Sequence, residues 1–160
     1  MKKINLIPAA TVLVLRDTNK CMEVFLVKRS KRPPFGNLYV FPGGKIDQDD
    51  SKKNIADLCE GLDDVQASVS LGISSGGLAY WVACVRECFE EVGILLAKKR
   101  DGSLLDLNGV EKEKYTSYRE MLLKNEISLY QICETEGLIL TTDNLAPFSH
   151  WITPEIEERR

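Results

Sequence analysis

The chain has 160 residues, of which 44% are hydrophobic and 28% are charged, and its net charge is -3. This size and composition are typical of one soluble globular domain, and no apolar stretch reaches the ~20 residues that a membrane span needs. The acidic balance argues against a broad basic surface for nucleic acid or an anionic membrane, although an anionic small molecule could still bind through a cation.

Two β-branched segments near the N-terminus, residues 9–16 and 22–28, predict two strands joined by a polar turn. The two lysines and the apolar run at the very start also resemble a secretory signal. Asn5 and Pro8 interrupt that run, however, and favour the pair of strands. We therefore expect a cytoplasmic protein that begins with a strand pair.

A loop rich in proline and glycine follows and carries three basic residues, Arg29, Lys31 and Arg32. The segment 38–41 then predicts a short strand, which we expect Pro42 and the two glycines after it to end. Residues 45–78 have a mixed pattern, with a short helix expected near 54–62 and a Ser/Gly-rich turn at 72–77.

Helical periodicity returns at Trp81 and continues to Val92, and Gly93 is a suitable helix stop. Cys84 and Cys88 lie one turn apart on this helix, where two small core residues are a better interpretation than a metal pair. The chain has five cysteines and no Cys-x-x-Cys spacing, which favours reduced and mostly buried thiols.

Two more helices are predicted at about 110–124 and 127–136, and residues 148–153 predict another strand. The stretch 116–136 could form half of a helix-turn-helix and so bind DNA. No basic recognition face follows it, so an amphipathic helix that begins at Ser128 and covers a core is the preferred interpretation.

The predicted helix ending at Gly93 gathers three carboxylates on one side, because Glu87, Glu90 and Glu91 are spaced i, i+3 and i+4. Each like-charge pair costs about 0.2–0.5 kcal/mol in an isolated helix, and anions in a last turn also oppose the helix dipole. Arg86 offsets only part of this. A divalent cation such as Mg²⁺ or Mn²⁺ would resolve the repulsion, while a solvated acidic turn is the simpler alternative.

Upstream, Gly43 and Gly44 follow the strand at 38–41 and allow the backbone to approach a ligand or a metal ion. Together with the helix, they resemble the Nudix box, G-x5-E-x7-R-E-U-x-E-E-x-G-U, in which U is apolar. Gly44 takes the place of the first glycine, and Asp50 stands where the first glutamate belongs. The second half of the pattern matches in order: Arg86, Glu87, Cys88, Glu90, Glu91, Gly93 and Ile94.

The spacing inside the box differs from the pattern, because 35 residues separate Asp50 from Arg86 where the pattern has 7. This resembles the coenzyme A and acyl-coenzyme A diphosphatase branch of the Nudix hydrolases, in which the box is split in this way. We expect a single Nudix-like domain over residues 1–160 with an insertion at about 51–78. Compared with that branch the chain looks shortened after "WITP", so we expect a fold that is incomplete at this end.

The resemblance implies an α/β/α sandwich with a mixed β-sheet and Mg²⁺- or Mn²⁺-dependent hydrolysis of a pyrophosphate bond. Coenzyme A or acyl-coenzyme A is the expected substrate, with ADP-ribose or NADH as alternatives. A non-catalytic module that senses a nucleotide is an alternative of another class. The expected partner is therefore a small nucleoside diphosphate derivative, and neither nucleic acid nor a membrane; the oligomeric state is left open.

The resemblance also assigns roles to individual residues. The catalytic set is Arg86, Glu87, Glu90 and Glu91. The metal ligands are Glu87, Glu90, Glu91 and the carbonyl of Gly44, with the carbonyl of Gly43 as a further candidate. The substrate-binding residues are Arg29, Lys31, Arg32 and Gly43, although a solvated basic loop explains the first three equally well. Asp50 is an additional box carboxylate and Glu90 a candidate general base, whereas the single histidine, His150, is expected to be structural.

Overall fold

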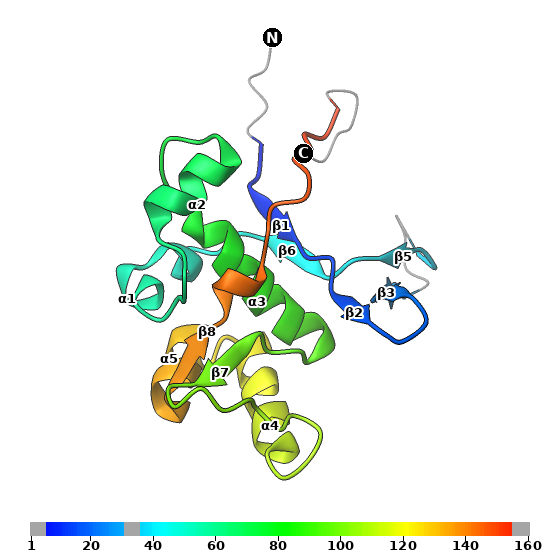
Figure 1. Ribbon diagram of the computed structural model, residues 1–160, viewed down its shortest axis with the longest axis vertical. Helices are drawn as coiled ribbons and strands as arrows, with labels where there is room; N and C mark the ends of the chain where they lie inside the picture. Colours follow the sequence, from blue (N-terminus) through cyan, green and yellow to red (C-terminus); the bar gives the residue numbers. More distant parts are fainter. Residues whose placement is uncertain (1–5, 31–35, 155–160) are drawn as a thin grey trace.

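The computed structural model describes residues 6–30 and 36–154. A central helix, α3 (Leu78–Val92), crosses the molecule and has the N-terminal strands along one side. Helix α2 (Asp64–Leu71) lies at its first end, and helices α4 (Lys112–Leu123) and α5 (Leu129–Glu136) lie on the side of α3 away from those strands (Figure 1). The α/β fold class is therefore confirmed, and α3, α4 and α5 occupy the segments where the sequence predicts helices.

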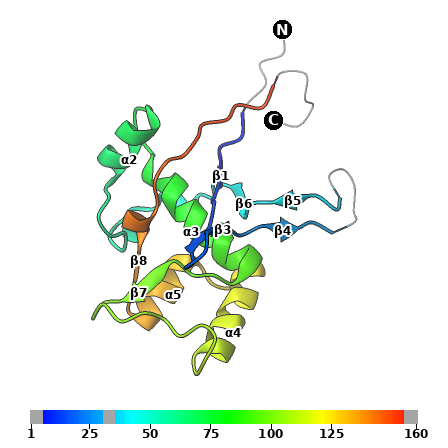
Figure 2. The ribbon, with the colours of Figure 1, turned by 45° about the vertical axis from the view of Figure 1, so that its right-hand side comes forward.

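The N-terminal strands form three antiparallel pairs. Strand β1 (Ala9–Thr11) pairs with β6 (Gly43–Lys45), β2 (Leu15–Asp17) with β3 (Met22–Val24), and β4 (Val27–Lys28) with β5 (Tyr39–Val40). The two predicted strands are therefore present, but each is divided between two partners. The β4–β5 hairpin extends away from the helices (Figure 2).

Strand β6 corrects the sequence analysis, which expected the chain to leave the sheet at Pro42. Pro42 lacks an N–H, but its carbonyl accepts a hydrogen bond from Val12 (2.9 Å), and the two glycines after it pair with β1. Glycine suits this position because a Cβ on Gly43 would lie 2.7 Å from the Cα of Thr11. The two glycines are thus part of the ladder rather than its end.

A fourth antiparallel pair joins β7 (Ala97–Lys99) to β8 (Leu138–Leu140), and the sequence analysis missed both strands. Parallel pairing is limited, within the described ranges, to one bridge between Cys59 and Leu140. The strand expected at 148–153 is wrong, since no ladder in the described part of the chain includes these residues. The aromatic side chains there, Phe148 and Trp151, are exposed and do not provide the buried face that a sheet strand needs.

A 3-10 turn (Asp49–Ser51) leads into the expected insertion, which holds the short helix α1 (Lys53–Ala56) and α2. Asp64 of α2 accepts hydrogen bonds from the N–H groups of Gly76 and Leu78, both at 3.0 Å, and so caps the start of α3. The backbones also meet closely, because a Cβ on Gly77 would lie 2.6 Å from the Cα of Ser68. The segment expected as an insertion therefore packs against the start of α3.

The hydrophobic core surrounds α3 and is completed by α5, β8 and α1. Val82, Val85 and Phe89 of α3 are buried, as are Ile132 of α5 and Leu138 of β8. Ser128 begins α5 with a capping box, as the sequence predicts, and its helix covers this core. No helix within the described residues is long and apolar enough to cross a membrane.

Candidate functional site

The glutamate-bearing end of α3 lies against β6, and the two glycines of β6 make this approach feasible. The carboxylate of Glu87 packs on the Cα of Gly44, where an added Cβ would lie 2.5 Å from its Cδ. The N–H of Gly43 donates a hydrogen bond to Oε2 of Glu91 (3.0 Å). Glu87 and Glu91, one helical turn apart, therefore both contact the Gly-Gly backbone.

The direction of the peptide groups in β6 decides which carbonyls face the glutamates. Val12 donates to the carbonyl of Pro42 (2.9 Å) at one end of the β1–β6 ladder. Ile46 donates to the carbonyl of Pro8 (3.1 Å) at the other end. Hydrogen-bonded pairs alternate in an antiparallel ladder, so Gly44, midway between Pro42 and Ile46, directs its N–H and C=O toward β1.

The neighbours of Gly44 in β6 face α3 instead. The N–H of Gly43 points to Glu91, and the carbonyl of Lys45 accepts a hydrogen bond from Nη2 of Arg86 (2.8 Å). Since the N–H and C=O of one strand residue point to the same side, the carbonyl of Gly43 also lies on the glutamate side. The geometry therefore favours Gly43 over Gly44 as the source of a carbonyl oxygen for a bound ligand.

Arg86 joins the carboxylates from both halves of the box. Its Nε and Nη2 donate to the two oxygens of Asp50, each at 2.9 Å, and the Asp50 side chain is only 2% exposed. Nη1 of Arg86 donates to Glu87 (2.9 Å) and to Glu90 (3.2 Å). Asp50 is thus brought to Arg86, where a planar guanidinium and a carboxylate form a bidentate pair.

The charges of this cluster shift two pKa values. Burial raises the pKa of Glu90 above its ordinary value and Glu87 adds to the rise, while Arg86 opposes it. Burial lowers the pKa of Arg86, but its hydrogen bonds and the charges of Asp50, Glu90 and Glu87 outweigh this and raise it above the ordinary value. Arg86 therefore keeps its charge, and the cluster holds more carboxylates than one guanidinium neutralises.

The donors of this cluster suit a hard cation, because they are carboxylate oxygens and a backbone carbonyl. The described residues do not, however, contain three acidic, histidine or cysteine side chains already gathered around one point. Glu87 and Glu90 are held by Arg86, and Glu91 is held by Gly43. Mg²⁺ usually keeps several waters and needs only one or two protein carboxylates, so Glu87, Glu91 and the Gly43 carbonyl fit such an ion.

A hollow of about 700 Å³, here called the hairpin hollow, lies between the β4–β5 hairpin and the end of α3. Gly43 and Glu91 border it, and so does Arg29, one of the expected substrate-binding residues. Lys31 and Arg32 lie outside the described residues. Three further side chains that no sequence pattern indicated also line it: Lys28, Tyr39 and Phe41.

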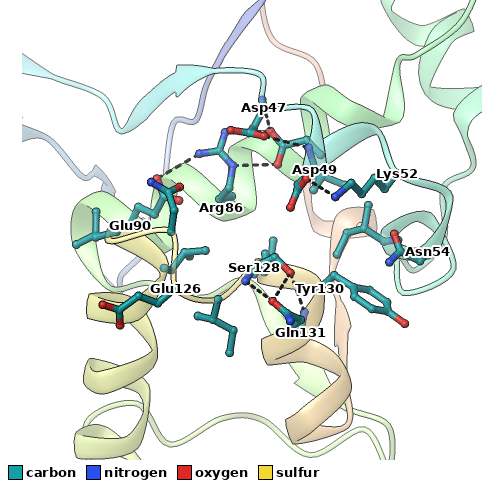
Figure 3. Close-up of a pocket in the computed structure, with 18 residues that line it drawn as sticks. Asp47, Asp49, Lys52, Asn54, Arg86, Glu90, Glu126, Ser128, Tyr130 and Gln131 are labelled. Atoms are coloured by element: carbon teal, nitrogen blue, oxygen red, sulfur yellow. Dashed lines mark hydrogen bonds and ion pairs between the residues drawn. The ribbon is translucent and has the colours of Figure 1, made fainter.

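A second hollow of about 670 Å³, the acidic hollow, lies on the other side of Arg86. Figure 3 shows Asp47 and Glu90 on either side of Arg86, with Ser128 and Gln131 on the opposite wall. Arg86 and its bound carboxylates therefore form a partition, with Glu91 facing one hollow and Glu90 the other. His150 is exposed and borders neither hollow.

Comparisons with known proteins agree with the resemblance seen in the sequence. No protein-family model matches the chain. The chain is 29% identical, over 85% of its length, to the acyl-coenzyme A diphosphatase NUDT19 of Xenopus laevis, of which it spans 43%. A crystal structure of a NUDIX hydrolase from Alicyclobacillus acidocaldarius superimposes with a TM-score of 0.73 at 25% identity, over 98% of this chain and 66% of that one. The chain thus resembles Nudix hydrolases in both sequence and fold.

Proposed function

We propose that this Nudix-like chain hydrolyses the pyrophosphate bond of a nucleoside diphosphate derivative with the help of Mg²⁺ or Mn²⁺. The observation that carries the proposal is the contact of Glu87 and Glu91 with the Gly-Gly backbone at the edge of the hairpin hollow. The similarity to an acyl-coenzyme A diphosphatase supports coenzyme A or acyl-coenzyme A as the substrate.

The residues that would hold the cation are Glu87, Glu91 and the carbonyl of Gly43, with Glu90 adding negative charge nearby. When bound, such a cation neutralises the phosphates and lowers the pKa of the attacking water. We assign the backbone ligand to Gly43 rather than to Gly44, because the ladder turns the Gly44 carbonyl toward β1.

Arg86 would position the carboxylates rather than bind the substrate. It is 11% exposed, and Asp50 fixes its guanidinium from the opposite side, so that Nη1 meets Glu87 and Glu90. Residues of this kind orient metal ligands, and their loss typically costs 10–100-fold in metal affinity. The expected catalytic role of Arg86 is therefore best described as holding the glutamates in place.

The hairpin hollow supplies the groups that would bind the substrate. Arg29 and Lys28 provide positive charge for phosphate oxygens, and Tyr39 provides an aromatic surface. Nζ of Lys28 lies 5.8 Å from the centre of the Tyr39 ring, so charge and aromatic surface are adjacent. A diphosphate at Gly43 and Glu91 would place the rest of a nucleotide along this hairpin.

The test is to incubate the purified chain and Mn²⁺ or Mg²⁺ with coenzyme A, acetyl-coenzyme A, ADP-ribose or NADH, and to identify the products by mass spectrometry. We expect 3′,5′-ADP and a phosphopantetheine product from the coenzyme A substrates, and none of either from Glu91→Gln. Preference for ADP-ribose would overturn the substrate assignment. Full activity of folded Glu91→Gln would overturn the metal site.

One observation favours a second candidate, a module that binds a nucleotide without cleaving it. The glutamates are each held by N–H donors of Arg86 or Gly43 instead of converging on one point. Binding of Mn²⁺ and coenzyme A with no product after prolonged incubation would support this candidate and exclude the hydrolase.

A further inference from the structure

We infer that Arg119 of α4 is a positioning residue for the glutamate-bearing end of α3. Its Nε donates hydrogen bonds to the carbonyls of Phe89 (3.0 Å) and Glu90 (2.8 Å), and its Nη2 donates to the carbonyl of Glu91 (3.0 Å). One guanidinium therefore binds three consecutive carbonyls of the last helical turn. This inference rests on the proposed function, because it concerns the same carboxylates.

These carbonyls belong to the part of a helix that normally lacks intrahelical partners. The last four C=O groups of α3 are those from Phe89 to Val92, and the N–H of Gly93 reaches only the first of them (2.9 Å). Arg119 supplies donors to the second and third and shares the first. A planar guanidinium suits this task, since it presents several N–H groups in a fixed fork.

The position of Arg119 also answers an electrostatic problem that the sequence poses. Glu90 and Glu91 lie in the last turn of α3, where the partial negative charge of the helix end disfavours anions. A buried or half-buried cation at this end offsets that charge through the backbone, without binding the carboxylates themselves. Arg119 is half-buried, and its hydrogen bonds to the carbonyls of Phe89 and Glu90 are partly sheltered from water, while the one to Glu91 is exposed.

The packing of α4 fixes the position of Arg119 relative to the last turn of α3. Tyr115, one turn before Arg119, is 2% exposed in the core, and the hydroxyl of Tyr118 donates to Glu136 of α5 (2.8 Å). Cδ of Arg119 also lies 3.9 Å from where a Cβ on Gly93 would be. The last turn of α3 is therefore clamped between β6, through Glu91, and α4, through Arg119.

The consequence for function is that Arg119 fixes the position of the backbone that carries the Glu90 and Glu91 side chains. Loss of the clamp would let the last turn fray, and the carboxylate of Glu91 would then leave the Gly43 backbone. Metal affinity would fall even in a protein that is otherwise folded, whereas a purely structural arginine would change only the melting temperature.

The experiment measures Mn²⁺ affinity by titration calorimetry and thermal stability by circular dichroism for Arg119→Gln, Arg119→Lys and a control. The control is Arg100→Gln, because Arg100 is 59% exposed and pairs with Glu134 at 3.2 Å on another part of the surface. All titrations are made well below the lowest melting temperature, so that every variant is folded.

We expect Arg119→Gln to raise the Kd for Mn²⁺ at least about tenfold, Arg119→Lys to recover part of the loss, and Arg100→Gln to match wild type. A folded Arg119→Gln variant with wild-type Kd overturns the inference, even if its melting temperature falls. If Arg119→Gln does not fold, an unchanged Kd in Arg119→Lys overturns it instead. A wild-type chain that binds no Mn²⁺ overturns the proposed function as well, which distinguishes the two failures.

Discussion

Gly44→Ala is the most direct test of the contact between β6 and α3. The new Cβ would lie 2.5 Å from Cδ and 2.7 Å from Oε2 of Glu87, whereas carbon atoms in contact are about 3.5–4.0 Å apart. The Glu87 carboxylate must therefore move by about 1 Å or more. Its hydrogen bond from Nη1 of Arg86, now 2.9 Å, would be stretched or lost.

The expected cost to the site is much larger than the cost to the fold. Displacing a group that orients a metal ligand typically costs 10–100-fold in metal affinity, so we expect the Kd for Mn²⁺ to rise by about that much if Glu87 holds the cation. The fold should lose less, because the clash is with the end of a side chain that can rotate. Titration with Mn²⁺ measures the first quantity, and thermal unfolding without metal measures the second.

Gly109→Ala provides the matched control for this substitution. Its added Cβ would also meet the end of an acidic side chain, that of Asp106, but in a loop before α4. We expect Gly109→Ala to bind Mn²⁺ as wild type does. If Gly44→Ala binds Mn²⁺ with the same affinity as Gly109→Ala, then Glu87 does not need its place on Gly44, and our reasoning about the site is refuted.

Three further predictions concern the rest of the domain. Asp50→Asn should lower the free energy of unfolding by about 1.5–3 kcal/mol in urea titrations. The loss should be smaller than for a fully broken buried ion pair, because Arg86 still donates hydrogen bonds to Glu87 and Glu90. An unchanged value would contradict the buried ion pair. Gly77→Ala should destabilise the fold more than Gly44→Ala does, since its Cβ meets the backbone of Ala67 at 2.5 Å, and equal melting temperatures would refute this. Iodoacetamide at pH 8 should label Cys21 alone in the folded chain, because Cys21 is exposed while burial raises the thiol pKa of the other four. The thiol pKa is raised to about 12 for Cys59, Cys84 and Cys133 and to about 11 for Cys88. Rapid labelling of any of these four would contradict their burial.

Local sequence signals predicted α3, α4 and α5 well, but they missed α2 and placed the short helix before it only approximately. The α3 helix has an apolar stripe and ends at Gly93, whose φ of 74° is one that glycine adopts readily. Ser128 and Gln131 form the capping box that starts α5. In these cases the residues that decide the structure are neighbours in the chain, so a pattern of a few positions is sufficient.

The strands were harder to predict because their partners are distant in the chain. Gly43 and Gly44 looked like strand breakers, yet they pair with β1 and leave room for Glu87. Residues 148–153 have the composition of a strand but join no ladder among the described residues. A sheet strand needs a neighbour as well as a suitable sequence, and only the folded structure supplies that information.

The site was predicted as a set of residues but not as an arrangement. The spacing predicted that Glu87, Glu90 and Glu91 share one side of the helix. Glu87 and Glu91 do meet the two glycines, whereas Glu90 borders the acidic hollow. The direction of the Gly44 carbonyl depends on the register with β1, which no local pattern encodes. Arg119 gave no signal either, since it is 28 to 30 residues away from the residues whose carbonyls it binds.

The cap that Asp64 places on α3 has a consequence for anyone who wishes to shorten this protein. Excising residues 51–78 to give the uninterrupted spacing of the Nudix pattern looks like the removal of a surface loop. It would also remove the cap at the start of α3, because Asp64 and the two N–H groups that it accepts, those of Gly76 and Leu78, all lie in the excised segment. A minimised variant would need a new Ser, Thr, Asp or Asn ahead of Trp81 before its glutamates could be expected to stay in register.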